Sequence, residues 1–582
     1  MLQTYFSEVW WMKKQNMKEK FWVAAVVMLL ILTVFAGCNK KSSQMPDGDG
    51  KPLKDFMGDF SNGAGQNFAA PEELSDVLET FNNDDMFSSR DGQTDYDEES
   101  AVYIKLKDGA SSATADNVAI EGDIITVSEG GTYVIEGALS DGSIVVNTAK
   151  EEKLQFILAG VDICCENGAP LYVKQTDKLF VTLQEGATNC LTQKGDVVEL
   201  DESNIDAAVF SKEDITFNGE GTLIVSSEKG HGIVSKDDLV FTGGKYEVTA
   251  AQHAVTGKDS VRFLSGTFSF NAGEDGMRSE NDEDTSLGYV YIAGGKFEID
   301  CKDDGIHAGA NVIVCDGKTL IENSYEGIEG RTIDVIGGEI ELTADDDGFN
   351  ATDGTTSEMG PGGFHGGNMP GGGFHGGGMP GMFPRGVAET EMPQIDMEMP
   401  AEQKTAIYVR FSGGKTTVNA GGDGIDSNGA LYVNGGEVYV YGPTNNGNGA
   451  LDYTTEAVVS GGTFFAVGQA GMAMNFGKAE GQGAAMVNIS GAAGALLEVR
   501  DSEGNVIASC EPSKSYNSVV VSCPELVVGN AYTVSSGSQA VSFNMENAIY
   551  GENGMGMGGP GGFPGGNMGG GSPGQNGGRP GW

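Results

Sequence analysis

The chain has little positive charge. Its 582 residues include 35 Lys and Arg against 83 Asp and Glu, which gives a formal net charge of −48. A surface this acidic repels phosphate groups. Direct binding to nucleic acid or to an anionic lipid surface is therefore excluded as a function.

Several structural signatures are also missing. The 91 glycines have no period of three, which excludes collagen. The sequence has no C-x-x-C pair, so a zinc ribbon or a thioredoxin-type redox motif is unsupported. Cys510 and Cys523 flank a hairpin-like stretch, and their pairing is left open. Hydrophobic residues make up 39% of the chain, too many for a wholly disordered acidic polymer.

One apolar run stands out near the N-terminus, and it is short. Basic residues between Lys13 and Lys20 precede the apolar stretch 21–36, which ends at Gly37 and Cys38. This stretch of about 16 residues falls short of the roughly 20 that a membrane-spanning helix needs. The pattern resembles a bacterial lipoprotein signal. We expect residues 1–37 to be a signal peptide and Cys38 to receive the lipid, with an uncleaved anchor helix as the alternative.

Three further segments are predicted to lack a packed core. Residues 38–100 are polar and acidic and predict a disordered tether between the membrane and a folded body. Residues 355–404 form an insertion rich in Gly, Met and Pro, and residues 551–582 form a Gly/Pro-rich tail of similar composition. The membrane is expected as a partner only through the N-terminal lipid.

The middle of the chain repeats. Nine copies of a short apolar alternation followed by a Gly turn occur between residues 215 and 467, most of them about 22 residues apart. A unit of this length has room for three short strands but not for a strand and a crossover helix, and a propeller blade needs about 40 residues. The repeat therefore predicts an all-β fold, a parallel β-helix over 101–480, with a C-terminal β cap over 481–550. The predicted turn glycines are Gly221, Gly244, Gly266, Gly295, Gly317, Gly338, Gly414, Gly436 and Gly462.

A second motif lies between the Gly turns, with the order acid, Gly, apolar, polar, small. Stacking of the coils would place these acids about 5 Å apart in a column, where adjacent carboxylates repel by about 3 kcal/mol at an effective dielectric of 20. Either the acids take up protons or cations lie between them, and rigidly spaced oxygens are what Ca²⁺ prefers. A solvated acidic edge is the alternative. The candidate metal-ligating residues are Asp275, Asp303, Asp304, Glu326, Asp345, Asp346, Asp347, Asn350, Asp353, Asp423 and Asp426.

Together these features resemble a known family over residues 110–475. The signal-like leader, the GVDI segment at 160–163, the EGATN segment at 185–189 and the repeated Asp-Gly motifs are similar to those of bacterial surface carbohydrate-binding lipoproteins. The resemblance implies a right-handed parallel β-helix akin to pectate lyases, bound Ca²⁺, and attachment to cellulose or acidic pectic chains. His231 and His253 depart from the acidic motif.

Three functions are compatible with this resemblance. The expected one is non-catalytic, calcium-dependent polysaccharide binding by a lipid-anchored monomer at the bacterial cell surface, with Tyr289, Tyr291 and Tyr325 as candidate rings for stacking on sugars. A polysaccharide lyase acting by β-elimination would need a base, for which Arg278 and Arg331 are weak candidates. A passive surface adhesin is the third.

Overall fold

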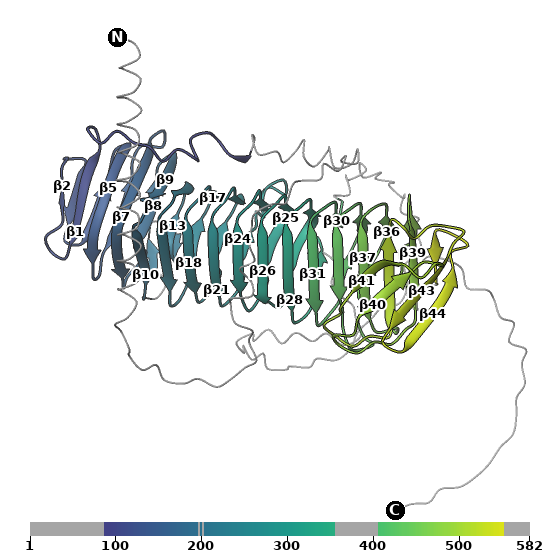
Figure 1. Cartoon of the computed structure of the whole chain (residues 1–582). Helices are drawn as coiled ribbons and strands as arrows, with labels where there is room; N and C mark the ends of the chain where they lie inside the picture. Colours follow the sequence, from purple (N-terminus) through teal and green to yellow (C-terminus); the bar gives the residue numbers. More distant parts are fainter. Residues whose placement is uncertain (1–85, 196–197, 201–202, 355–405, 552–582) are drawn as a thin grey trace, which may run out of the picture. The chain divides into compact units, whose positions relative to one another are not determined.

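The structure is a computed structural model that describes residues 86–195, 198–200, 203–354 and 406–551. The elements in these ranges are 45 strands, 39 of which belong to one mixed sheet (Figure 1). The prediction of an all-β protein is confirmed. Over the same ranges, no helix has the length and apolar character that crossing a membrane requires.

The sequence repeat is the structural repeat. The copy at 239–248 forms strands β17 (Asp238–Phe241) and β18 (Lys245–Ala250), joined by a turn at Gly244 with a φ of 93°. The strands of the next copy pair in parallel with these two, so that Leu239 faces Val261 and Tyr246 faces Phe268. Each copy adds a third strand before the first two. We call one such set of three strands a coil.

Parallel pairing between coils produces three ladders of strands. Ladder 1 contains the strands that follow the acidic motif. It comprises β6 (Ser143–Asn147), β8 (Leu171–Gln175), β13 (Ala207–Ser211), β16 (His231–Ser235), β19 (Val255–Gly257), β22 (Met277–Ser279), the first parts of β25 (Ile306–Val314) and β27 (Ile328–Val335), β29 (Phe349–Ala351), β32 (Ile425–Ser427) and β35 (Leu451–Tyr453).

Ladder 2 contains the strands that precede the Gly turn. It comprises β9 (Lys178–Leu183), β14 (Asp214–Gly219), β17, β20 (Ser260–Phe263), β23 (Tyr289–Ile292), the second parts of β25 and β27, β30 (Tyr408–Phe411), β33 (Ala430–Val433), β36 (Glu456–Val459) and β38 (Lys478–Ala479).

Ladder 3 contains the strands that follow the Gly turn. It comprises the second part of β7 (Lys153–Cys165), whose first part pairs with β9 in ladder 2, and β10 (Thr188–Gln193), β15 (Thr222–Ser227), β18, β21 (Thr267–Ala272), β24 (Lys296–Asp300), β26 (Lys318–Asn323), β28 (Glu339–Ala344), β31 (Lys415–Ala420), β34 (Glu437–Tyr441) and β37 (Thr463–Gly468).

The core lies between the ladders, where residues at the same position of successive coils stack on one another. The rings of Tyr246 and Phe268 are stacked with centroids 5.0 Å apart, and Phe268 stacks on Phe297 at 4.8 Å. Side chains alternate between buried and exposed along these strands, as in β18 and β21. Burying each ring contributes about 1.5–3 kcal/mol to folding.

Both ends of the ladders use antiparallel pairing. At the beginning, β1 (Val102–Lys107) pairs with β2 (Ser112–Ala113), and β3 (Val118–Glu121) pairs with β4 (Ile124–Val127), while β5 (Gly131–Leu139) joins β1 to β7 in parallel. Strands β11 (Val198–Leu200) and β12 (Ser203–Ile205) form a separate hairpin.

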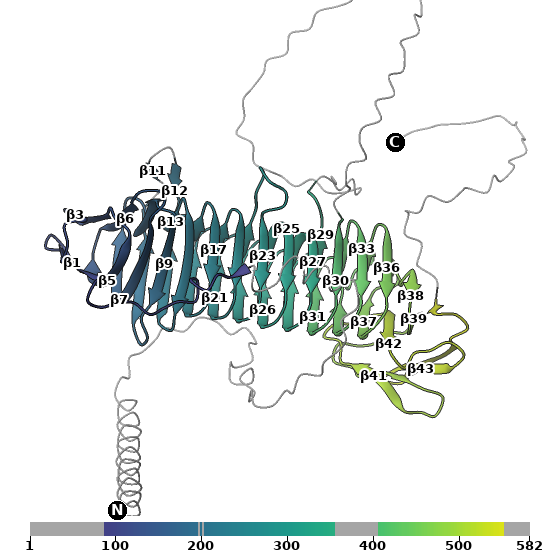
Figure 2. The ribbon, with the colours of Figure 1, turned by 90° about the horizontal axis from the view of Figure 1, so that it is seen from above.

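At the other end, β42 (Ser518–Cys523) runs antiparallel to both β37 and β39 (Gly483–Val487). A four-stranded sheet lies beside it (Figure 2). One buried cluster joins Leu497 and Val534 of this sheet to Val519 of β42. Antiparallel strands of this kind protect the open edge of a parallel sheet from pairing with other chains. The remaining strands of this region are β40 (Leu497–Arg500), β41 (Val506–Cys510), β43 (Ala531–Ser536), β44 (Gln539–Asn544) and β45 (Ile549–Tyr550).

The end of the predicted tether packs against ladder 2. Asp91 is only 3% exposed, and its Oδ1 lies 2.9 Å from the Nζ of Lys178 and accepts a hydrogen bond of 2.7 Å from Thr216. Arg262 donates to the backbone oxygen of Met86 over 2.8 Å. Residues 86–98 are therefore attached to the folded body, which differs from the expectation for this end of the tether.

Several of the segments predicted from the sequence lie outside the residues that the structure describes. Residues 1–37, the lipidation site Cys38, the insertion 355–404 and all but the first residue of the tail 551–582 lie outside the described residues. The seven cysteines after Cys38 are free thiols, including Cys510 and Cys523.

Candidate functional site

The acidic motif forms the turn between ladder 3 and ladder 1. The apolar residue of each motif is buried, as Ile306 and Phe349 show with no exposure. The glycine before it cannot carry a side chain, because a Cβ at Gly305 would lie 2.6 Å from the backbone oxygen of Gly327 in the next coil. Each coil therefore presents its acid at the same place, and the acids form the predicted column.

The column acids bind the backbone of the next coil. Asp275 accepts the N–H of Asp304 over 3.1 Å, Asp347 accepts that of Asp423 over 2.6 Å, and Asp423 accepts that of Gly449 over 2.5 Å. Each of these carboxylates thus uses one oxygen to hold the next coil. The second oxygen of Asp275 contacts the guanidinium of Arg278.

The two histidines take the same position with the same role. The Nδ1 of His231 accepts the N–H of His253 over 3.2 Å, and the Nδ1 of His253 accepts the N–H of Asp275 over 3.0 Å. Their rings stack with centroids 4.9 Å apart. Burial, together with the neighbouring His253, lowers the pKa of His231 to about 3, so that this ring is neutral. Histidine therefore replaces aspartate here as a hydrogen-bond acceptor.

The first acids of the column are neutralised by the protein's own cations. The guanidinium of Arg278 lies 2.9 Å from Asp275 and also contacts Glu280. Burial opposes ionisation of Asp275, but the adjacent His253 ring and the guanidinium of Arg278 lower its pKa to about 2. The sequence contains a signal for this pairing, because Arg278 occupies the polar position of its own motif.

The next coil repeats this arrangement with an imidazolium. The Nδ1 of His307 lies 3.0 Å from Asp304 and 3.3 Å from Glu329. Burial disfavours the charged ring, but the two carboxylates raise the pKa of His307 to about 10. The positive charge in this part of the column therefore comes from side chains, an outcome that sequence reasoning missed.

The second half of the column is different. Burial, together with the charges of Asp423 and Asp426, raises the pKa of Asp347 to about 9. Burial and the charges of Asp304 and Glu329 raise that of Glu326 to about 8. Among the described residues, no Lys, Arg or His forms an ion pair with Glu326, Asp346 or Asp347. Within the part of the chain that the structure describes, no ion pair with a basic side chain relieves the repulsion on Glu326, Asp346 and Asp347.

An amide oxygen lies in the same part of the column. Asn350 donates its Nδ2 to Glu326 over 2.8 Å, while its Oδ1 is buried and has no hydrogen-bond partner in the described part of the chain. The strand register places Asn350 directly between Glu329 of the preceding coil and Asp426 of the following one. Carboxylate and amide oxygens are the donor types that Ca²⁺ prefers. The clusters of three His, Asp or Glu ligand atoms within 4.8 Å of one another among the described residues lie in earlier coils.

The remaining predicted ligands lie at the rim of the column. Oxygens of Asp275, Asp303 and Asp304 come within 4.8 Å of one another, and Asp303 is exposed. Asp345 and Asp353 are also exposed. A third cluster of possible ligand atoms joins His231, His253 and Glu274, also within 4.8 Å.

The candidate catalytic and aromatic residues differ in their exposure to solvent and in their contacts. Arg331 donates to the backbone oxygen of Thr285 over 2.9 Å. Tyr325 is 37% exposed and bonds to Asp346, which raises its pKa. Tyr291 is 1% exposed, and the ring of Phe87 lies 6.0 Å from it. Of the three tyrosines predicted to stack on sugars, Tyr325 is therefore the one that faces solvent beside the column.

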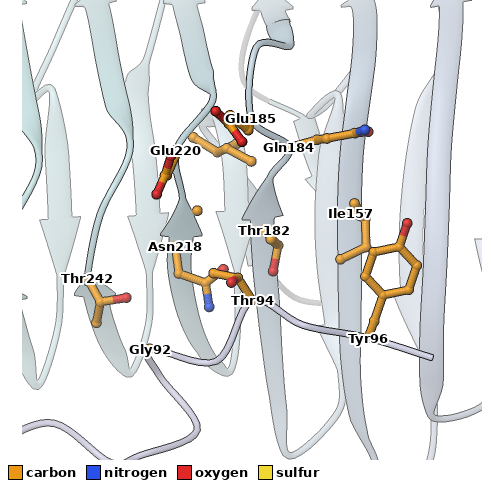
Figure 3. A pocket seen from close by; sticks show the side chains of 12 residues that line it. Gly92, Thr94, Tyr96, Ile157, Thr182, Gln184, Glu185, Asn218, Glu220 and Thr242 are labelled. Atoms are coloured by element: carbon orange, nitrogen blue, oxygen red, sulfur yellow. The ribbon is translucent and has the colours of Figure 1, made fainter. Parts of the chain in front are cut away.

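A surface pocket lies where residues 92–96 cross ladder 2. It encloses about 430 Å³. Figure 3 shows Thr94 and Tyr96 on a stretch of chain that runs across the strands carrying Thr182 and Asn218.

Two sequence comparisons match this chain to carbohydrate-binding domain-containing proteins. The model of a family described as carbohydrate-binding domain-containing protein matches residues 121–369. A carbohydrate-binding domain-containing protein of Acetivibrio thermocellus is 32% identical over 216 residues, which are 37% of this chain and 76% of that protein. Among solved structures, the gadolinium derivative of the polysaccharide lyase-like protein from C. thermocellum is 31% identical and covers 40% of this chain and 95% of its own, with a TM-score of 0.38.

Proposed function

The chain belongs to the family of carbohydrate-binding domain-containing proteins, and on this premise we propose that it binds polysaccharide without cleaving it and with the help of Ca²⁺. The proposed ligand is an acidic, pectic type of chain. The proposed location is the bacterial cell surface, with the protein anchored through a lipid on Cys38.

One observation carries the calcium part of this proposal: among the described residues, basic side chains form ion pairs with acids of the first coils of the column but not with Glu326 or Asp347. Arg278 and His307 compensate the acids of their own coils. Glu326 and Asp347 have pKa values of about 8 and about 9, because burial and neighbouring carboxylates disfavour their charged forms. A bound divalent cation would remove this repulsion. The proposed ligands are Glu326, Asp347, Asn350, Asp423 and Asp426.

Calcium would also explain how so acidic a protein could hold a uronate chain. With a net charge of −48, the protein repels carboxylates in solution. A calcium ion shared between a column carboxylate and a uronate reverses this repulsion locally. Tyr325, which is exposed and bonded to Asp346, offers a ring for a sugar held in this way.

The proposed architecture is a right-handed parallel β-helix. Three ladders of parallel strands and a repeat of about 22 residues support it. In such a solenoid the column runs along the axis, which suits a linear polymer.

Binding is preferred over β-elimination because of the state of Arg278. A lyase base must give up its proton, whereas the contacts with Asp275 and Glu280 outweigh burial and raise the pKa of this guanidinium. Incubation with polygalacturonate should therefore yield no ultraviolet-absorbing unsaturated product. Appearance of that product would establish a lyase.

The test of the proposed function is a calorimetric titration of polygalacturonate into the full chain, with calcium and with chelator. Binding is expected in calcium only. Asp347→Asn should weaken it, whereas Asp116→Asn, at an exposed position outside the column, should not. Absence of binding in calcium would refute the function, and equal binding in chelator would refute the role of the metal.

A further inference from the structure

Residues 86–98 lie across the outer face of ladder 2, where side chains of the strands bind their backbone. Arg262 donates to the backbone oxygen of Met86 over 2.8 Å. Asn218, on a strand nearer the start of the ladder, donates to the backbone oxygen of Asp91 over 2.9 Å. Contacts of this kind are independent of the side chains of the bound segment and are typical of surfaces that hold an extended peptide.

Three side chains of the segment add selectivity to this backbone binding. The carboxylate of Asp91 lies 2.9 Å from the Nζ of Lys178, whose side chain is 13% exposed. The guanidinium of Arg90 lies 4.4 Å from the centre of the Phe180 ring. The ring of Phe87 lies 6.0 Å from a second ring on the same face. The face therefore fits an aromatic residue that is followed three and four positions later by Arg and Asp.

The segment is bound to the solenoid without being part of its sheets or core. Residues 86–98 contribute no strand, and the buried hydrophobic clusters of the described residues include none of them. A pocket of about 430 Å³ remains between residues 92–96 and the strands beneath them (Figure 3). Detachment of the segment therefore breaks no ladder of backbone hydrogen bonds and opens no core, and every coil keeps its neighbours.

An unoccupied face would be unfavourable, and this determines what can replace the segment. Detachment takes the carboxylate of Asp91 away from Lys178 and uncovers the ring of Phe180, which is 1% exposed in the bound state. A half-buried cation that loses its partner is strongly destabilising. The replacement must supply a carboxylate and a covering side chain at the same spacing. A second copy of the chain carries a segment that does so at every position.

We propose that the outer face of ladder 2 is a peptide-recognition surface that accepts residues 86–98 from a second copy of the chain. Exchange of an identical element between copies is a low-cost route to assembly, because each contact that is lost is made again in the partner. In dilute solution a copy's own segment wins, since its effective concentration is on the order of millimolar. Exchange is expected where copies are crowded or where one copy's own segment is defective. The inference uses neither the carboxylate column nor polysaccharide binding.

The experiment mixes two full-length variants with complementary defects. Asp91→Ala keeps the face but impairs the segment, whereas Lys178→Ala keeps the segment but impairs the face. Sedimentation velocity of either variant alone should show no association. The mixture should show a complex of one copy of each, because the intact segment of one copy binds the intact face of the other. An excess of a synthetic peptide of residues 86–98 should dissociate this complex.

The matched control replaces Lys178→Ala by Lys245→Ala, at an exposed position of β18. That copy keeps its own segment on its own face, so its mixture with Asp91→Ala should contain about tenfold less complex. A first mixture without complex, a control mixture with as much complex, or a complex that the peptide leaves intact would overturn the proposal. Circular dichroism identifies a folding defect in Lys178→Ala, in which case Thr216→Val, which removes the hydroxyl bonded to Asp91, must give the complex instead.

Discussion

Calcium binding at pH 7 should release close to two protons from this protein. The proposed site contains Glu326 and Asp347, whose pKa values of about 8 and about 9 are raised first of all by burial and then by neighbouring carboxylates. Without metal, both carboxyls therefore carry a proton at neutral pH. With a cation between them, both ionise, and their protons leave.

The magnitude follows from the two pKa values. At pH 7 a group with a pKa of about 9 is roughly 99% protonated, and one with a pKa of about 8 is roughly 90% protonated. The folded-state pKa values of these two carboxyls are raised, whereas those of acids in folded proteins are usually lowered, so their contribution to stability has the opposite pH dependence. In the unfolded chain these groups ionise near pH 4, so the contribution of Glu326 and Asp347 to the stability of the calcium-free fold is most favourable below pH 4 and becomes less favourable as the pH rises towards 9. Calcium should cancel this loss.

The assay is calorimetric titration of calcium into the full chain at pH 7 in two buffers with different ionisation enthalpies. The difference in apparent enthalpy gives the number of protons released. Asp347→Asn should reduce this number by about one, and Asp116→Asn should leave it unchanged. Calcium binding with no proton release would refute the reasoning, because it would place the ion elsewhere or show that these carboxyls are ionised beforehand.

Three further predictions concern the fold. Asp91→Ala leaves the Lys178 side chain, which is 13% exposed, without its carboxylate, and should cost about 3–5 kcal/mol of unfolding free energy in a denaturant titration and speed proteolysis within 86–98. Since the pKa of Asp91 is lowered to about 2, this contribution should be present above pH 4 and fade towards pH 2. Phe268→Ala removes a ring stacked on both sides and should cost about 3–5 kcal/mol by the same titration, with a smaller effect refuting tight stacking. Gly305→Ala places a Cβ 2.6 Å from the next coil and should lower the yield of soluble protein, whereas unchanged yield and circular dichroism would show that the turn can shift.

The repeat could be predicted from sequence because each coil uses the same alternating strands and the same glycine turn. Alternation with a period of two marks the strands, and glycine marks a turn that needs positive φ. Eight of the nine predicted turn glycines have positive φ. In the first copy Gly219 takes this conformation instead of Gly221. The position of the acidic column followed from the same periodicity.

What could not be predicted depends on contacts between distant parts of the chain. Residues 86–98 have no periodicity, and the burial of Asp91 depends on Lys178 and Thr216, 87 and 125 residues away. The ion pairs that neutralise the first acids of the column also could not be predicted, because they depend on distances between side chains. Arg278 and His307 stood at the expected phase, but only distances show that they bind the column acids rather than solvent.

The hydrogen bonds along the column have a consequence for how such a chain can change length. At five positions of the column the side chain accepts a hydrogen bond from an amide of the coil that follows, and both aspartate and histidine do so: His231, His253, Asp275, Asp347 and Asp423. A whole coil can therefore be duplicated or removed without disturbing its neighbours, provided that the cut falls at the same phase and an acceptor remains on each side of the junction. Because the same hydrogen bond links coils at several positions of the column, the number of coils can change by whole units.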